Sequence, residues 1–302
     1  MGKIKVICTS TGCIEYAPER YRELGIDILR IHVFFNGNEY REGLDLDPVA
    51  FYRELETIED PKNHLPSTGM PETEEIRACF ERALDEGCDE VMVFALSSAL
   101  GGTYNKICLV AKEYEDRLTI HAIDTKITCF GEGLLAIKAA TWAKEGKTSE
   151  EILREIRWMM KHQEFIGVDG KLDYLIYNGR LKGGKAFMGQ MLNICPVIHF
   201  SKEGEIVPLE SVRTQKKALA RTCELLRDMI GDRAPEDYLL WHIYTGPSLL
   251  EQLLPIEKKY GIETNHEAVI MSPVSGAHNG PWLAGYGLAF LRRDDEPLED
   301  GE

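Results

Sequence analysis

The chain has 302 residues, of which 44% are hydrophobic and 28% are charged, so it can bury a sizeable core. Its formal net charge of −15 disfavours nucleic acids and anionic membrane surfaces as partners, because both are negatively charged. No apolar run approaches the roughly 20 residues that span a bilayer, and residues 2–5 lead directly into a strand-like run without a signal peptide. We therefore expect a cytoplasmic protein without stable membrane insertion.

The eight cysteines are scattered along the chain and form no C-x-x-C pair. Several lie in apolar runs, as Cys195 does, which is typical of free buried thiols in a reducing compartment. No cluster of cysteine and histidine has the spacing of a zinc site, so we predict no metal.

In the first half of the chain, strand-like and helical patterns alternate. Residues 3–8, 90–96 and 118–123 are predicted as buried strands, and residues 71–86, 103–114 and 131–144 as helices. Such alternation is typical of a parallel sheet covered on both faces.

Local signals mark the ends of several elements. The alternating residues 29–35 run into Asn36-Gly37, which predicts a hairpin. Asp47-Pro48 is typical of a helix start, and residues 148–151 form a capping box that begins another helix.

The second half has a different pattern. Residues 194–200 and 205–209 flank a turn and predict a hairpin, followed by a long helix over 214–230. Further strands are predicted at 238–244, 267–271 and 285–291, a helix near 248–260, and a disordered acidic tail over 294–302. The predicted fold class is α/β: a parallel-sheet α/β domain over residues 1–162, and an α+β domain with a mixed or antiparallel sheet over 163–302.

Three polar loops follow predicted strands, where ligands bind in parallel α/β sheets. Residues 8–12 include Ser10, whose hydroxyl and neighbouring amides suit an oxyanion; an ordinary polar turn is the alternative. Residues 66–71 place Thr68 close to a predicted helix N-terminus, which favours a carboxylate or phosphate; simple capping of that helix is the alternative.

The third loop, residues 96–104, is the strongest local signal. Ser97 and Ser98 leave a buried strand, and Gly101-Gly102 permit close approach of a ligand to the backbone. A Ser- and Gly-rich turn without a ligand remains the alternative.

Two segments of the second half could also bind an anion. The basic, glycine-rich residues 178–185 superficially match G-x-x-x-x-G-K, but Ala186 stands where a phosphate-binding loop needs Ser or Thr, so we predict no nucleotide site. Arg180 could contact a carboxylate or phosphate, or be a solvated surface arginine. His278 lies among small residues in a predicted tight loop, where it could donate to an anion or move a proton.

Seven motifs follow one another along nearly the whole chain: Cys8-Thr9-Ser10-Thr11, Tyr40-Arg41-Glu42-Gly43-Leu44-Asp45, Pro66-Ser67-Thr68-Gly69-Met70-Pro71, Ser97-Ser98-Ala99-Leu100-Gly101-Gly102-Thr103-Tyr104, residues 172–180, Val212-Arg213-Thr214-Gln215-Lys216-Lys217-Ala218 and Gly276-Ala277-His278-Asn279-Gly280. In this order they resemble the DegV family of bacterial lipid-binding proteins. The chain departs from the family pattern where Thr9 replaces Asp, Gly69-Met70 replace Ser-Gln, and Gly101 replaces Ser. Each change removes a polar group near the expected pocket mouth.

The resemblance implies two α/β lobes that bury one long-chain fatty acid, with no cofactor. It also implies a partner, an ATP-dependent fatty acid kinase subunit that phosphorylates the bound acid for phospholipid synthesis, so the chain itself is expected not to be an enzyme. The resemblance implies that Thr68 and Ser98 hydrogen-bond the carboxylate, and that Arg180 and His278 lie where the phosphoryl group arrives. The expected ligand-binding residues are Ser10, Thr68, Ser97, Ser98, Arg180 and His278, with no catalytic and no metal-binding residues.

An acyl-ester hydrolase is the alternative, with Ser98 as nucleophile and His278 as base. The sequence has no G-x-S-x-G elbow at Ser98 and no evident acid to orient His278.

Overall fold

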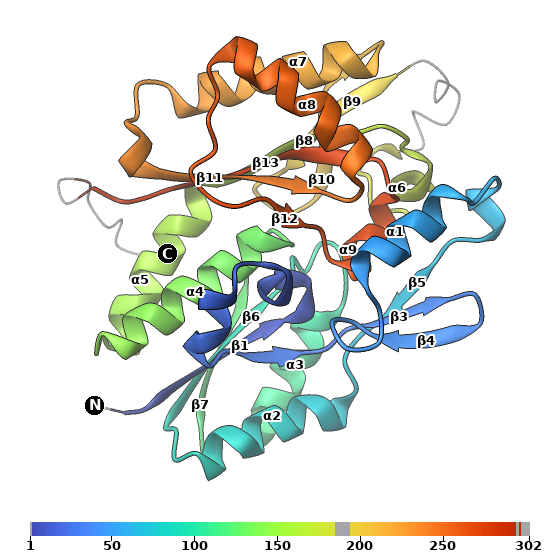
Figure 1. Ribbon diagram of the computed structural model, residues 1–302. Coiled ribbons are helices and arrows are strands. Elements are labelled where there is room, and N and C mark those ends of the chain that lie inside the picture. Colours follow the sequence, from blue (N-terminus) through green and yellow to red (C-terminus); the bar gives the residue numbers. More distant parts are fainter. Residues whose placement is uncertain (1, 185–193, 294–295, 297–302) are drawn as a thin grey trace.

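The computed structural model describes residues 2–184, 194–293 and 296, which form two lobes stacked on one another (Figure 1). The first lobe contains a four-stranded parallel sheet in the order β2-β1-β6-β7, as the alternating pattern predicted. Its strands are β1 (Ile4–Thr9), β2 (Asp27–Leu29), β6 (Glu90–Ala95) and β7 (Thr119–Asp124).

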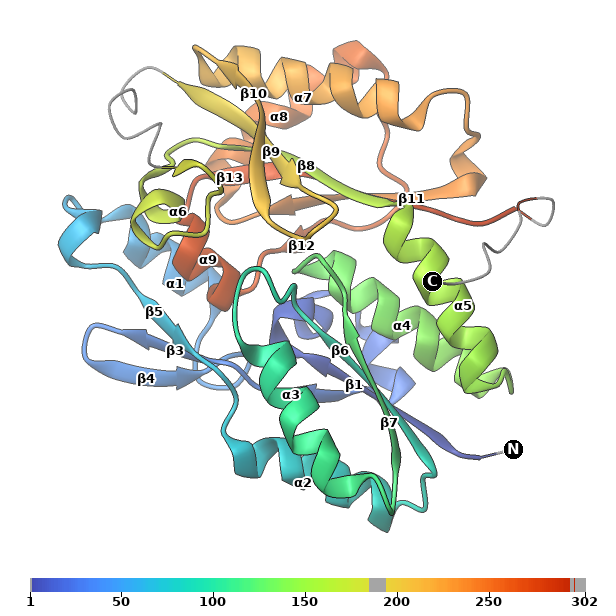
Figure 2. The same cartoon turned by 180° about the vertical axis from the view of Figure 1, so that it is seen from behind.

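Helices cover both faces of this sheet (Figure 2). Apolar side chains of α2 (Thr73–Asp85) and α3 (Thr103–Ala111) pack against one face. The other face packs against α4 (Phe130–Lys144), and α5 (Ser149–Lys161) packs against α4. The predicted capping box of α5 is confirmed, because the side chains of Thr148 and Glu151 each bond the other's backbone amide.

A small antiparallel sheet, β4-β3-β5, extends the first lobe. The predicted hairpin is present: β3 (His32–Phe35) and β4 (Asn38–Arg41) are joined by Asn36 and Gly37, both with positive φ. Helix α1 (Pro48–Glu56) begins as predicted, with the Asp47 carboxylate accepting from the amide of Ala50.

The environment predicted for Thr68 was wrong. Thr68 lies in the middle of β5 (Ser67–Gly69) opposite Val33 of β3, and α2 begins only at Thr73. A strand of Ser, Thr and Gly has no hydrophobic alternation, so its pairing with β3 leaves no signal in the sequence.

The second lobe is built on a six-stranded sheet in the order β10-β9-β8-β13-β11-β12, in which only the β11–β12 pair is parallel. Helices α7 (Gln215–Ile230) and α8 (Pro247–Tyr260) cover its outer face. The mixed sheet is confirmed, although the strand expected over 267–271 is reduced to two residues. The strands are β8 (Gln163–Asp169), β9 (Cys195–Phe200), β10 (Ile206–Val212), β11 (Tyr238–Tyr244), β12 (Val269–Ile270) and β13 (Leu283–Phe290).

One hydrophobic cluster joins the inner face of the second sheet to α4 of the first lobe. Phe130 of α4 meets Trp241 of β11 edge to face, with ring centroids 5.3 Å apart. The chain passes from the first sheet to the second between α5 and β8, near residue 163. The division into domains of residues 1–162 and 163–302 stays a prediction, because the two lobes share one hydrophobic cluster.

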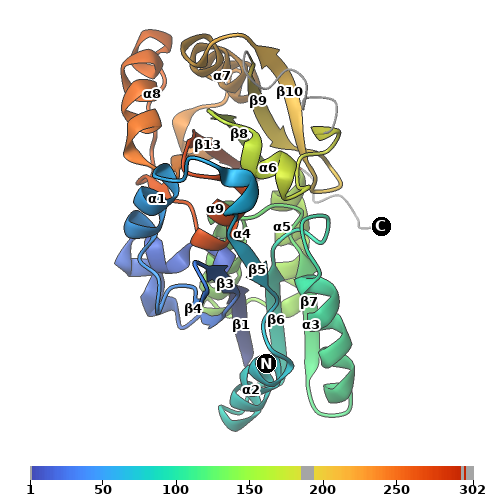
Figure 3. The ribbon, with the colours of Figure 1, turned by 90° about the vertical axis from the view of Figure 1, so that its right-hand side faces the viewer.

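A short helix, α9 (Pro273–Asn279), lies between the lobes and carries the histidine that was predicted in a tight loop (Figure 3). The Ser272 side chain caps it by accepting from the amide of Ser275 at 3.2 Å. From the first lobe, the Tyr52 hydroxyl lies 2.9 and 3.0 Å from the carbonyl oxygens of Met271 and Ser272. The small residues of the motif are required by this packing, since a Cβ at Gly276 would lie 2.2 Å from the Tyr52 hydroxyl oxygen.

We predict that Gly276→Ala destabilises the protein by about 1–3 kcal/mol, because the added methyl group overlaps the Tyr52 ring. Urea denaturation followed by circular dichroism measures the free energy of unfolding. Gly101→Ala is the matched control, since a Cβ there meets no atom within 4 Å. Equal stability of the two variants would contradict the close packing of α9 against Tyr52.

Candidate functional site

Three of the predicted ligand-binding residues, Thr68, Arg180 and His278, line one cavity between the lobes. They come from β5, from the turn after α6 (Asp173–Tyr177) and from α9. The Thr68 hydroxyl and Nε2 of His278 are 2.9 Å apart, which joins the two lobes directly. The cavity is also lined by Ile31, Gly69, Met70, Leu96, Leu100, Gly101, Gly102, Thr103, Thr128, Ile206, Val274, Ser275 and Asn279.

The imidazole of His278 is neutral at physiological pH. Burial, followed by the positive charge of Arg180, lowers its pKa to about 3. Its Nδ1 atom is buried and has no hydrogen-bond partner within the described ranges. When the Thr68 hydroxyl donates to Nε2, Nδ1 carries the proton and is left to donate to a ligand oxygen.

Arg180 is held against α9 by a short relay. Its guanidinium donates to the backbone carbonyl of Asn178, and the side-chain Nδ2 of Asn178 donates to the backbone carbonyl of Ala277 at 3.2 Å. This uses one nitrogen of the guanidinium, and its planar donor set suits a carboxylate or a phosphate. Arg180 is therefore a cavity residue rather than a solvated surface arginine.

Sequence reasoning missed two hydroxyl groups of the same cavity, those of Thr128 and Ser275, which are 3.2 Å apart. Ser275 directly precedes the Gly276–Gly280 motif, so proximity to the motif was a usable signal. Thr128 precedes α4 in a stretch without any recognisable pattern.

Behind this polar mouth lies an apolar cavity, with which it shares Thr128, Ile206 and Asn279. Its walls come from α4 and from the inner face of the second sheet. The side chains that line it include Ile127, Phe130, Phe165, Ile198, Phe200, Trp241, Ile243, Met271 and Leu283. A polar mouth that opens on an apolar interior fits an amphiphile with a small anionic head.

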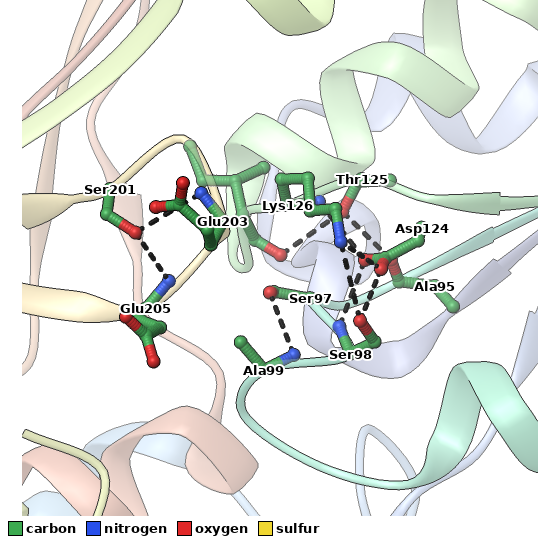
Figure 4. A network of polar contacts seen from close by, with 11 residues as sticks. Ala95, Ser97, Ser98, Ala99, Asp124, Thr125, Lys126, Ser201, Glu203 and Glu205 are labelled. Atoms are coloured by element: carbon green, nitrogen blue, oxygen red, sulfur yellow. Dashed lines mark hydrogen bonds and ion pairs between the residues drawn. The ribbon is translucent and has the colours of Figure 1, made fainter. Parts of the chain in front are cut away.

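Ser97 and Ser98 are not among the residues that line the mouth. The amide and hydroxyl of Ser98 both donate to the carboxylate of Asp124, which also pairs with Lys126 at 2.6 Å (Figure 4). These contacts lower the pKa of Asp124 against the opposing effect of burial. Ser98 thus ties the end of β6 to the end of β7.

Ser97 supports a contact between the lobes. Its hydroxyl accepts from the amide of Ala99 at 3.2 Å. A Cβ at Gly204, in the β9–β10 turn, would lie 2.1 Å from that hydroxyl oxygen. Because Gly204 also has a φ of +83°, glycine is needed for this turn to reach the first lobe.

Ser10 also acts behind the site. Its hydroxyl accepts from the amide of Ile31 at 3.1 Å. The buried carboxyl of Glu42 accepts from the amide of Val274 at 3.0 Å, in the first turn of α9. Burial raises the pKa of Glu42, and the nearby Ser10 hydroxyl and the Val274 amide oppose that rise.

The serine–histidine pair of a hydrolase is not formed, because Ser98 bonds Asp124 whereas His278 bonds Thr68. No group of three or more metal-ligating side chains occurs in the part of the chain that the structure describes. None of the helices over the described residues is long and apolar enough to cross a membrane. Lys185, the end of the phosphate-loop-like segment, and most of the acidic tail lie outside the described residues.

A family model described as "Uncharacterised protein, DegV family" matches residues 3–291. A DegV domain-containing protein of Listeria monocytogenes is 31% identical over 287 residues, which is 94% of this chain and 97% of that protein. The crystal structure of a fatty acid binding DegV family protein from Streptococcus agalactiae superimposes with a TM-score of 0.85 at 29% identity, covering 97% of this chain and all of that chain (100%). The crystal structure of DegV from Bacillus subtilis, described as a fatty acid binding protein, gives a TM-score of 0.80 at 29% identity, covering 96% and 100% of the two chains. The protein described here therefore belongs to the DegV family.

Proposed function

We propose that the chain binds one long-chain fatty acid, with its carboxylate in the mouth and its hydrocarbon chain in the apolar cavity. The observation that carries the proposal is that the two cavities share walls, while Thr68, Arg180 and His278 lie only at the mouth. The solved relatives from Streptococcus agalactiae and Bacillus subtilis are both described as fatty acid binding.

The energetics suit such a ligand. A carboxylate that leaves water needs charge-assisted hydrogen bonds, which the Arg180 guanidinium and Nδ1 of a neutral His278 can supply while the Thr68 hydroxyl donates to Nε2 and so holds the proton on Nδ1. The hydrocarbon contributes about 0.8 kcal/mol for each buried CH₂ group, so most of the affinity comes from the chain. The mouth then fixes the direction in which the acid enters.

The chain presents the bound carboxylate to a separate, ATP-dependent kinase subunit in the cytoplasm and does not itself catalyse a reaction. In that step a carboxylate oxygen attacks the terminal phosphorus of ATP, giving the acyl phosphate and ADP. Arg180 and His278 stand beside the oxygen that acquires the phosphoryl group, and the guanidinium can neutralise its charge. The resemblance to the DegV family and the position of both side chains at the mouth support this role.

We predict that Thr68→Val lowers the affinity for the natural acid by about tenfold or more, because without the hydroxyl the proton of His278 is no longer held on Nδ1 and the hydrogen bond from Nδ1 to the charged carboxylate is lost. Organic extraction and mass spectrometry of the purified protein identify the acid, which is then titrated into the delipidated variants by calorimetry. Ser98→Ala is the matched control and should bind like the wild type, since that hydroxyl bonds Asp124. Failure of the wild type to retain or take up any fatty acid would overturn the proposed function. A loss of affinity in Ser98→Ala as large as that in Thr68→Val would indicate instead that the carboxylate binds at the Ser97-Ser98 loop.

Gly101 offers a gain-of-function test. It lines the mouth at the place where the family pattern has serine, and a Cβ there meets no atom within 4 Å. We predict that Gly101→Ser raises the affinity for the acid about fivefold or more, because the new hydroxyl can donate to the carboxylate. Gly101→Ala, with no donor, should stay at the wild-type affinity, and a serine variant no tighter than the alanine variant would contradict the placement of the carboxylate.

The neutral His278 also predicts a pH dependence. Its folded-state pKa of about 3 lies below the ordinary histidine value of about 6.5, so between these values the unfolded chain binds a proton that the folded chain does not. The free energy of unfolding of the delipidated protein should therefore fall as the pH drops through this window, and His278→Gln should make that slope shallower. Urea denaturation at a series of pH values measures this free energy of unfolding. The substitution His64→Gln, at an exposed histidine, is the control. Identical slopes in His278→Gln and the wild type would show that His278 is not held neutral.

A further inference from the structure

Gln163, the first residue of β8, has a carboxamide that the protein leaves unbonded. The residue is 8% exposed, and both Nε2 and Oε1 are buried without a hydrogen-bond partner anywhere in the described ranges. Buried donors and acceptors are nearly always paired in proteins, because leaving them unpaired is costly. A side chain with two such atoms indicates a group that the protein binds.

The carboxamide lies where the apolar cavity meets a second hollow. Its Oε1 would be 3.5 Å from a Cβ at Gly131, a residue that lines the apolar cavity. Gln163 itself lines a broad groove beside α5, which shares four residues with the apolar cavity. The shared residues are Ile127, Glu164, Phe165 and Phe200, a different set from the three that the cavity shares with the mouth.

Packing alone does not call for a glutamine here. Phe165, two residues along β8, is buried in the hydrophobic core between the lobes and meets Phe200 edge to face at 5.9 Å. The backbone of Gln163 is already paired with Ala289 of β13. None of these contacts gives the carboxamide a hydrogen bond, so both of its polar atoms are left for a polar ligand group.

We propose that the preferred ligand is a fatty acid with a hydroxyl group on its hydrocarbon chain, and that Gln163 hydrogen-bonds this hydroxyl. The inference rests on the proposed function, since it assigns a second polar contact to the same bound acid. A carboxamide can both donate and accept, as can a hydroxyl, whereas a plain hydrocarbon chain leaves both amide atoms unpaired. Sites built to hydrogen-bond a substrate hydroxyl discriminate strongly against the analogue that lacks it.

The test is competition binding to the delipidated full-length protein. The probes are octadecanoic acid and its monohydroxylated isomers, with the hydroxyl placed from the middle of the chain to the terminal carbon. We expect at least one isomer to bind about tenfold more tightly than octadecanoic acid, and Gln163→Leu to abolish or reverse that preference. The ligand-free Gln163→Leu variant should also have a higher melting temperature than the wild type, because an unpaired buried amide is removed.

Phe165→Leu is the matched control on the same strand. This substitution makes one side chain in the cavity wall smaller but keeps it apolar. It should therefore weaken the binding of all the acids alike and leave the preference for a hydroxylated isomer unchanged. Tight binding of octadecanoic acid with no preference for any hydroxylated isomer, or a preference that survives in Gln163→Leu, would overturn this inference and leave the proposed function standing. If no acid of either kind bound the wild type, the proposed function itself would fail.

Discussion

The site depends on the hydrogen bonds that hold α9 against the first lobe. Helix α9 carries His278, yet the amide of Val274 in its first turn donates to Glu42, a buried carboxyl of the first lobe. The oxygen of Tyr52 lies within hydrogen-bonding distance of the two carbonyls just before the helix. A helix of seven residues is too short to be stable by itself, so its position and that of the imidazole are set by these contacts. Because Glu42 is buried, its hydrogen bond with the Val274 amide can be broken only at the cost of leaving a second desolvated carboxyl oxygen unpaired.

That arrangement gives the mouth its electrostatic character. His278 is kept neutral by burial and by Arg180, so Arg180 supplies the positive charge while the imidazole contributes a directed hydrogen bond. A second cation would bind an anion more strongly but would need its own counter-charge in the empty protein. A neutral donor beside one guanidinium can lose its ligand without leaving two buried like charges, which suits the proposed role of a protein that binds a fatty acid and must also release it.

The sequence predicted most of what depends on local chemistry. The Asn36-Gly37 turn, the Asp47 cap and the Thr148 capping box were all found, because turn and cap preferences act over a few neighbouring residues. Thr68, Arg180 and His278, which the resemblance to a family assigned to one ligand, line one cavity. The strand that carries Thr68 and the helix that carries His278 were not predicted. The hydrogen bond between Ser98 and Asp124 could not be predicted from the sequence. Polar side chains on two loops at the same sheet edge can bond each other or a ligand, and sequence spacing does not show in which direction they point.

Gly101 and Gln163 together suggest where selectivity lies in this chain. The mouth has glycine where the family pattern carries a serine hydroxyl, so head-group binding has one potential donor fewer. Gln163, in contrast, has a carboxamide with two unpaired atoms in the groove that shares walls with the apolar cavity. Apolar contacts along a hydrocarbon chain add affinity for any acid that fits, whereas a buried polar atom penalises every chain that fails to pair with it. A polar contact with the hydrocarbon of the ligand, in place of one with its carboxylate, therefore costs little total affinity. It makes the protein discriminate between fatty acids by their hydrocarbon chains, which is where fatty acids differ from one another.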